Sequence, residues 1–151
     1  MNNTNYFLDD CVKIIRGFEI GFNHQSINNK GKGYKIIKGE NVKKYHIVEG
    51  EYFVDADFSD SKTFKKEEYF FTTPKLLTRF VSNQLIFAYD ARGYCNTNVV
   101  YNILKKTGCK LDLKFLLGLL NSTLLNFWFY NTYSNTDKVF PHIQKNQLAA
   151  I

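Results

Sequence analysis

The sequence predicts an α+β fold, in which a mostly antiparallel sheet is followed by a C-terminal pair of helices. Short runs rich in β-branched and aromatic residues recur over residues 12–104, separated by polar or glycine-containing segments, as is typical of strands joined by turns. From Leu111 onward the apolar residues instead recur every three to four positions, which is the spacing of a helix. The chain has 151 residues, 44% hydrophobic and 17% aromatic, so residues 1–151 can bury the core of one domain.

The first strands are expected at residues 12–15 and 34–37, because each run is rich in β-branched residues and passes into a glycine, Gly17 or Gly39. Residues 24–33 between them are polar and predict an exposed loop. Further strands are expected at residues 52–54, 69–72, 76–81, 85–89 and 99–104. Asn83 predicts a hairpin between two of them, and Asp90-Ala91-Arg92-Gly93 predicts a turn, because Asp and Gly favour turn geometries.

The helix pair is expected from the leucine spacing and from two capping signals. Asp112 precedes the first helix and is placed to cap it, and Asn121-Ser122 interrupts the pattern and can cap a second helix. The apolar stripe of the first helix consists of Leu113, Leu116, Leu117 and Leu120. We expect the Leu/Phe/Trp stripe of residues 113–130 to be core that covers the sheet. Polar residues within this segment argue against a membrane span, because they would be costly in lipid.

The net charge of +6 and the pI of about 9.1 favour a polyanionic partner. Between Lys30 and His46 six lysines face one acid, whereas Glu51 to Glu68 carries six acids against three lysines. A solvated lysine-rich surface is the alternative explanation. Neither the three cysteines nor the three histidines have the spacing of a metal site, and no disulfide framework is expected. The first residues carry no secretion signal, so a cytoplasmic, reducing compartment is expected.

The candidate contacts with a nucleic acid follow from charge and turn placement. The expected phosphate contacts are Lys35, Lys38, Lys43 and Lys44, and the candidate base contacts are Arg79, Arg92, Asn96 and Asn98. Arg can bind guanine, and Asn adenine, through paired hydrogen bonds. The alternatives are an ion-paired arginine and asparagines that only stabilise a turn. Tyr45 either stacks on a base or packs against a strand.

The sequence predicts no catalytic residue. It contains no glycine-rich phosphate loop and no Ser/His/Asp or Cys/His arrangement. Asp55 and Asp57, together with Asp60 or Glu67, could bind a divalent ion in a small nuclease. However, the segment also contains Ser59, Ser61 and Lys62, which favours a solvated loop.

Several short phrases, in this order, resemble the C-terminal specificity domain of TaqI-like adenine-specific DNA methyltransferases and of the fused restriction-modification enzymes related to them. They are Ile14-Ile15-Arg16-Gly17, Gly21-Phe22-Asn23, Ile36-Ile37-Lys38-Gly39, Val42-Lys43-Lys44-Tyr45, Pro74-Lys75-Leu76-Leu77, Ala88-Tyr89-Asp90, Gly93-Tyr94, Leu119-Leu120-Asn121-Ser122 and Phe140-Pro141-His142-Ile143. The phrases cover nearly the whole chain, and their order is more specific than any one of them.

The resemblance implies a target-recognition domain that binds double-stranded DNA, while a separate upstream domain binds S-adenosylmethionine and methylates a flipped adenine. The family's Asn-Pro-Pro-Tyr-type motif and cofactor loop are absent from these 151 residues, so no cofactor and no catalytic residue are expected here. The chain is therefore expected to be a piece of a longer enzyme and to work with the missing catalytic domain. The alternative function is a protein-interaction module within a larger assembly.

Overall fold

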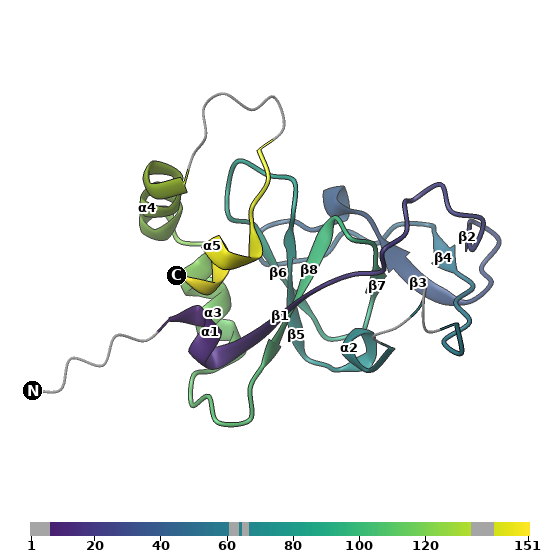
Figure 1. Ribbon diagram of the computed structural model, residues 1–151, viewed down its shortest axis with the longest axis horizontal. Coiled ribbons are helices and arrows are strands. Elements are labelled where there is room, and N and C mark those ends of the chain that lie inside the picture. The colour runs from purple at the N-terminus through teal and green to yellow at the C-terminus, as the bar shows by residue number, and fades with distance from the viewer. Residues whose placement is uncertain (1–6, 61–63, 65–66, 134–140) are drawn as a thin grey trace, which may run out of the picture.

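The computed structural model describes residues 7–60, 64, 67–133 and 141–151, and it confirms the α+β fold. Figure 1 shows most of the helices gathered at one end of an elongated molecule, a central sheet beside them and a smaller sheet at the other end. The elements are α1 (Leu8–Cys11), β1 (Val12–Arg16), β2 (Ile27–Asn28), β3 (Tyr34–Ile37), the 3-10 helix η1 (Gly39–Asn41), β4 (Phe53–Val54), α2 (Glu67–Phe71), β5 (Lys75–Arg79), β6 (Phe87–Asp90), β7 (Cys95–Asn96), β8 (Val100–Lys105), α3 (Leu113–Leu120), α4 (Thr123–Tyr133) and α5 (Lys145–Ala149). The predictions that concern residues 1–4, Ser61, Lys62, Phe140 and the Glu67 side chain lie outside the described residues.

The central sheet has the strand order β1-β8-β5-β6, and all its neighbours are antiparallel. The expected hairpin is confirmed: in the β5–β6 pair Lys75 lies opposite Asp90, and Thr78 lies opposite Phe87. Alternate residues of β5 are buried on opposite faces. Leu76 packs in the cluster that includes the helices, and Leu77 packs in a second cluster on the side of the smaller sheet.

The smaller sheet has the order β2-β4-β3-β7, with β3 and β7 parallel. The strands thus form two sheets where the sequence predicted one. Strand β2 lies within the segment expected to be a loop, and β7 follows the predicted turn. Each of these strands has only two residues, so neither is long enough to show an alternating pattern.

Residues 69–72 are predicted to form a strand, and this prediction is wrong, because they overlap helix α2. Phe70 packs into the core, whereas Phe71 is 39% exposed, and neither pairs in a sheet. The Phe70 ring is fully buried and lies 4.2 Å from the Phe18 ring, centroid to centroid. Phe70 therefore packs into a hydrophobic cluster from a helical backbone, and this contact outweighs the usual preference of aromatic residues for strands.

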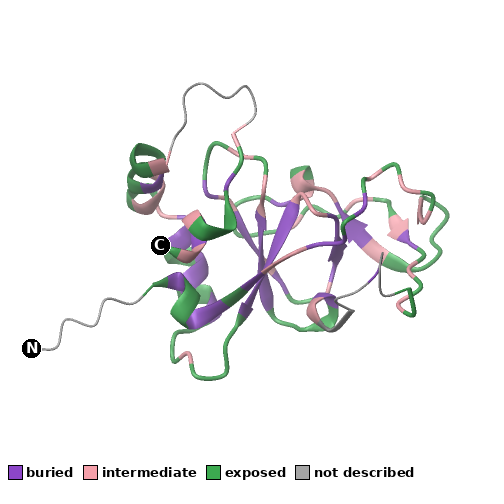
Figure 2. Ribbon diagram, viewed as in Figure 1, coloured by how far each residue is buried: buried purple, intermediate pink, exposed green. Residues whose placement is uncertain are grey.

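Helix α3 forms as predicted. Its four-leucine stripe is buried, and the Asp112 carboxylate accepts a hydrogen bond of 2.7 Å from the Lys114 backbone N–H. The expectation that the stripe continues as core is wrong for α4. Phe129 is buried, but Leu124 is 80% and Phe127 68% exposed (Figure 2). The apolar residues of α4 surround the helix, so only one side can face the core. Within the described residues, no helix is long and apolar enough to cross a membrane.

Substituting Asp112 with alanine is expected to lower the free energy of unfolding by about 1 kcal/mol. The substitution removes the acceptor for a backbone N–H in the first turn of α3, and that turn has no other side-chain cap. Urea denaturation followed by circular dichroism measures the change. Asp112→Ser, which can cap the helix as well, should recover most of the loss; an equal loss in both variants would contradict the capping role.

The outer edge of β6 is covered by side chains and a loop. The buried Asn121 amide accepts a hydrogen bond of 2.9 Å from the Phe87 N–H and donates one of 2.9 Å to the Phe87 carbonyl. The Asn126 side chain accepts a bond of 2.8 Å from the Leu85 N–H. The Tyr45 backbone N–H, from the preceding loop, also donates a hydrogen bond of 2.7 Å to the Phe87 carbonyl. Asn121, between α3 and α4, and Asn126, within α4, thus attach the helix pair to the sheet.

Candidate nucleic-acid interface

The four candidate phosphate lysines fall into two environments. Lys35 forms an ion pair of 2.8 Å with Glu49, and the Lys38 ammonium lies 4.5 Å from the centroid of the Tyr52 ring. Lys43 and Lys44 are exposed, and no ion pair involves them within the part of the chain that the structure describes. The ammonium groups of Lys43 and Lys44 can therefore bind an anion without first breaking an ion pair with a carboxylate.

Lys43 and Lys44 belong to the loop of residues 42–47, which we call the basic loop. Its ends form an antiparallel bridge between Val42 and Ile47. Its tip is attached to β6, because the Tyr45 N–H donates to the Phe87 carbonyl at 2.7 Å and the Tyr89 N–H donates to the Tyr45 carbonyl at 3.3 Å. The loop is therefore fixed at its base and at its tip, so its lysines project from a defined backbone.

Arg79 attaches the same loop to β5. Its Nε and Nη2 atoms donate hydrogen bonds of 2.9 and 2.7 Å to the Val42 carbonyl. A guanidinium with five donors can bind a carbonyl with two of them and hold it in a defined direction. These contacts give Arg79 a positioning role beneath the basic loop, which differs from the base contact expected from its sequence position.

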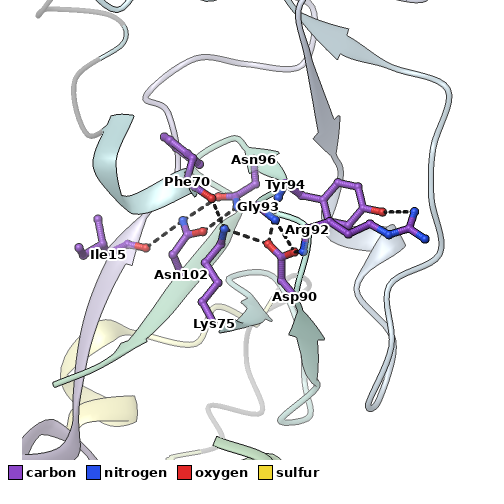
Figure 3. Close-up of polar contacts among 9 residues, drawn as sticks. All are labelled: Ile15, Phe70, Lys75, Asp90, Arg92, Gly93, Tyr94, Asn96 and Asn102. Carbon is purple, nitrogen blue, oxygen red and sulfur yellow. Dashed lines mark hydrogen bonds and ion pairs between the residues drawn. The ribbon is translucent and has the colours of Figure 1, made fainter. Parts of the chain in front are cut away.

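The predicted turn after β6 is confirmed, and its centre is a buried carboxylate (Figure 3). The Asp90 carboxylate accepts hydrogen bonds of 2.9, 2.9 and 3.0 Å from the backbone N–H groups of Arg92, Gly93 and Tyr94. Gly93 has a φ of 78°, which a residue without a side chain adopts with little strain. The turn therefore directs the Arg92 side chain outward from a rigid base.

Lys75 is the counter-ion of Asp90. Its ammonium lies 2.9 Å from the Asp90 carboxylate, and both side chains are 0% exposed. The same ammonium donates to the Phe70 carbonyl. Burial lowers the pKa of Lys75, while the Asp90 charge opposes that shift. Sequence reasoning missed this pair; its signal is a lysine within an apolar strand, Lys75-Leu76-Leu77, and an acid at the far end of the next strand.

Glu49 is a second residue that the sequence analysis missed. Its carboxylate binds Lys35 through one oxygen, and through the other it accepts hydrogen bonds from Arg92 and from the Tyr94 hydroxyl. Desolvation raises the pKa of Tyr94, so that hydroxyl stays a donor at neutral pH. Glu49 thus joins β3 to the turn after β6 and neutralises two of the predicted DNA-contacting cations. The Arg92 side chain is still 71% exposed.

The two candidate asparagines lie in different places. Asn96 is fully buried, and its amide exchanges two hydrogen bonds of 3.0 Å with the Asn102 amide on β8 (Figure 3). This pair, packed against Gly17, joins the two sheets and leaves Asn96 no exposed edge for a base. Asn98 is half-buried, and its carbonyl accepts two hydrogen bonds from Arg16. Its side chain therefore remains a candidate for base contact.

The acidic segment is engaged mainly in local contacts. Asp55 forms an ion pair of 2.6 Å with Lys32, and hydrogen bonds from Ser59 lower the pKa of Asp57. The described residues contain no group of three His, Cys, Asp or Glu side chains that could hold a metal ion. Glu67, the third candidate for a nuclease centre, has a side chain that lies outside the described residues.

The end of the molecule near α3 and α4 carries an exposed apolar surface, which we call the helical surface. Its members share an exposure of 40% or more and lie on these two helices. They are Phe115, Leu119, Leu124, Phe127, Trp128 and Tyr130. Large apolar side chains exposed on two helices that pack against each other favour contact with another protein surface.

Comparisons with known proteins give one family and one fold. The family model described as the TaqI-like C-terminal specificity domain matches residues 34–151. No curated protein matches the sequence at a significant level.

Three solved structures have the same fold. The HsdS subunit from Thermoanaerobacter tengcongensis has a TM-score of 0.65 and 14% identity, over 97% of this chain and 31% of that chain. A chain from a study of complex assembly and conformational transition of the type I R-M system has a TM-score of 0.62 and 14% identity, over 96% and 32%. The S subunit of the type I system from M. genitalium has a TM-score of 0.60 and 16% identity, over 100% and 34%. The chain thus spans about a third of the length of each.

Proposed function

Because this chain belongs to the family of TaqI-like C-terminal specificity domains, we propose that it recognises a specific sequence in double-stranded DNA for a restriction-modification enzyme. The observation that carries the proposal is the basic loop. It presents two exposed lysines without an ion pair among the described residues, on a backbone fixed to β5 and β6. Such lysines bind phosphates, and a fixed backbone sets the register of the protein on the duplex.

In this proposal the basic side chains divide the work. Lys43 and Lys44 hold phosphates, and Lys35 joins them when DNA displaces Glu49. Lys38 is a weaker phosphate candidate, because its ammonium lies over two aromatic rings. Arg92, which is exposed on the turn after β6, and the half-buried Asn98, between β7 and β8, are the base contacts in this proposal.

Two arginine substitutions separate positioning from base contact. Arg79→Gln is expected to weaken DNA binding about equally for all sequences, because it loosens the basic loop without removing a base contact. Arg92→Ala is expected to weaken the preferred site by roughly 1–3 kcal/mol and to relax the preference at one base pair. Sequencing of the DNA retained by each variant measures both effects. A uniform loss from Arg92→Ala, or a changed preference from Arg79→Gln, would contradict the assigned roles.

We further propose that the parent enzyme is an adenine-specific DNA methyltransferase, with or without endonuclease activity, and that this domain itself catalyses no reaction. S-adenosylmethionine would bind to the parent's catalytic domain. The resemblance of the ordered phrases supports this assignment, and the helical surface offers that domain an apolar face on which to pack. A cytoplasmic location is supported by three cysteines that are free thiols, as is usual in reducing compartments.

A protein-interaction module is the second candidate function, and the helical surface favours it. In that case the domain would dock a partner subunit, and the positive charge would be incidental. Binding to DNA that weakens steeply with salt separates the two functions, because phosphate contacts release counter-ions and apolar docking does not.

The test of the proposed function is the salt dependence of binding to a pool of randomised duplexes, followed by sequencing of the retained DNA. A steep salt dependence with one enriched short motif supports a specificity domain and identifies its target. A steep dependence without a motif means that the backbone is bound but specificity requires the catalytic domain. Absence of binding contradicts the proposal. Incubation with magnesium or manganese tests the nuclease alternative, for which cleavage is the required result.

A further inference from the structure

Tyr45 has an unusual backbone conformation. Its φ is 74°, and no other non-glycine residue of the described chain has a positive φ. In this left-handed region the Cβ of an L-residue approaches the backbone too closely, so bulky side chains are rarely found there. A glycine would adopt the same conformation with less strain. The turn itself therefore does not require a tyrosine.

The neighbouring structure holds Tyr45 in this conformation. Its N–H and carbonyl are both bonded to β6, the Val42–Ile47 bridge closes the loop around it, and Arg79 anchors the Val42 carbonyl. A residue in a strained conformation persists only where the surrounding contacts determine it, and such residues are concentrated at functional sites. These four tethers belong to the loop backbone and to Arg79, so none of them depends on the Tyr45 ring.

The Tyr45 side chain is available for a ligand. It is 52% exposed, and the structure gives its ring no aromatic partner and its hydroxyl no hydrogen bond within the described residues. Tyr34 and Tyr52, which are also exposed, pack against the rings of Phe71 and Phe22. The Tyr45 ring has no such aromatic neighbour among the described residues, so stacking on a base, one of the two roles expected from the sequence, would not require an aromatic contact to be broken.

The charge next to Tyr45 points to the class of ligand. Lys43 and Lys44 precede the ring directly and are exposed. A fixed aromatic ring beside basic side chains is the combination with which proteins bind an unstacked base between its phosphates. Apolar and aromatic side chains inserted at a base step also unstack duplex DNA.

We propose that the Tyr45 ring stacks on a nucleobase of the bound duplex, while Lys43 and Lys44 hold the adjacent phosphates. This inference rests on the proposed function and adds a contact to it. The tethers to β5 and β6 keep the backbone of Tyr45 in place before DNA arrives. The backbone of the loop then does not have to be ordered on binding.

The test compares Tyr45→Gly, Tyr45→Phe and Tyr130→Ala with the unaltered chain, on a duplex enriched from the randomised pool. Tyr130 is the matched control, because it is 50% exposed and lies on α4. Tyr45→Gly is expected to unfold at the same or a higher temperature, yet to bind the duplex on the order of 10-fold more weakly, since stacking on one base contributes that much. Tyr45→Phe should bind within about two-fold of the unaltered chain, because stacking does not need the hydroxyl. Tyr130→Ala should bind normally.

A second measurement reports the stacked base directly. With 2-aminopurine placed at successive positions of the duplex, one position should change its fluorescence when the unaltered chain binds and not when Tyr45→Gly binds. Normal binding by Tyr45→Gly, a lowered unfolding temperature that accompanies its weaker binding, or an equal loss in Tyr45→Phe would each overturn the inference while leaving DNA recognition intact. Failure of the unaltered chain to bind any duplex would overturn the proposed function, and this contact with it.

Discussion

Substitution of Asp90 with asparagine is expected to lower the free energy of unfolding by about 3–5 kcal/mol, the usual cost of removing one partner of a buried ion pair. The variant leaves the buried ammonium of Lys75 without its counter-charge, and it weakens an acceptor of three backbone hydrogen bonds. Because whole domains are stable by only about 5–15 kcal/mol, a large part of the stability should be lost. Urea denaturation at neutral pH measures the change.

The matched control is Asp9→Asn, which removes an acid from an exposed pair, Asp9 and Lys106, with 4.0 Å between its charged atoms. Exposed pairs contribute at most about 1 kcal/mol, so this variant should be nearly as stable as the unaltered chain. Adding Lys75→Met to Asp90→Asn should recover part of the loss, because the unpaired ammonium is then gone. A cost below about 1 kcal/mol for Asp90→Asn would show that Lys75 carries no buried charge.

The double substitution of Lys43 and Lys44 with glutamine is expected to weaken DNA binding strongly. If each lysine neutralises one phosphate, the slope of log affinity against log salt becomes shallower by about 1.8. If the variant and the unaltered chain bind DNA equally at about 1 M salt, the variant then binds roughly 60-fold more weakly at about 0.1 M salt. Fluorescence anisotropy of a labelled duplex at several salt concentrations gives both values. The folding stability should change little, because both side chains are exposed.

Lys105 and Lys106 offer a control with the same loss of charge. Both are exposed, and they lie at and just beyond the end of β8, whereas Val100 at its other end lies opposite Arg79. If the basic loop is the contact, Lys105→Gln/Lys106→Gln should retain most of the affinity and of the salt slope. Equal losses from the two double variants would instead indicate attraction by net charge alone, without a defined site.

Local sequence patterns were sufficient to predict those elements that are held together by contacts between residues close in sequence. The four leucines of α3 lie on one helical face, and Asp112 and Asp90 bond to backbone groups within four residues of themselves. The fold class followed from these patterns as well. Helix α2 was misjudged because Phe70 owes its place to a distant aromatic partner, Phe18, and not to its own strand preference.

The candidate site was harder to predict, because the partners of its polar residues are remote in sequence. Arg79 bonds to Val42, 37 residues away, and the Glu49 carboxylate bonds to Arg92, 43 residues away. Asn96 was expected at the surface because asparagine is polar, but an amide can be buried when a second amide satisfies it, as Asn102 does. Nothing in the local sequence of these residues distinguishes a paired group from an exposed one.

The covered edge of β6 also determines how copies of this domain can meet. An open edge strand invites a strand from another molecule to add to the sheet and is a common route to aggregation. Here the Phe87 carbonyl already accepts hydrogen bonds from Tyr45 and Asn121, and the Tyr89 N–H is bonded to Tyr45. Strand addition at this edge would require the basic loop to be removed first. The contacts that fix the loop therefore also prevent β6 from pairing with a strand of another copy when several copies of the domain lie close together.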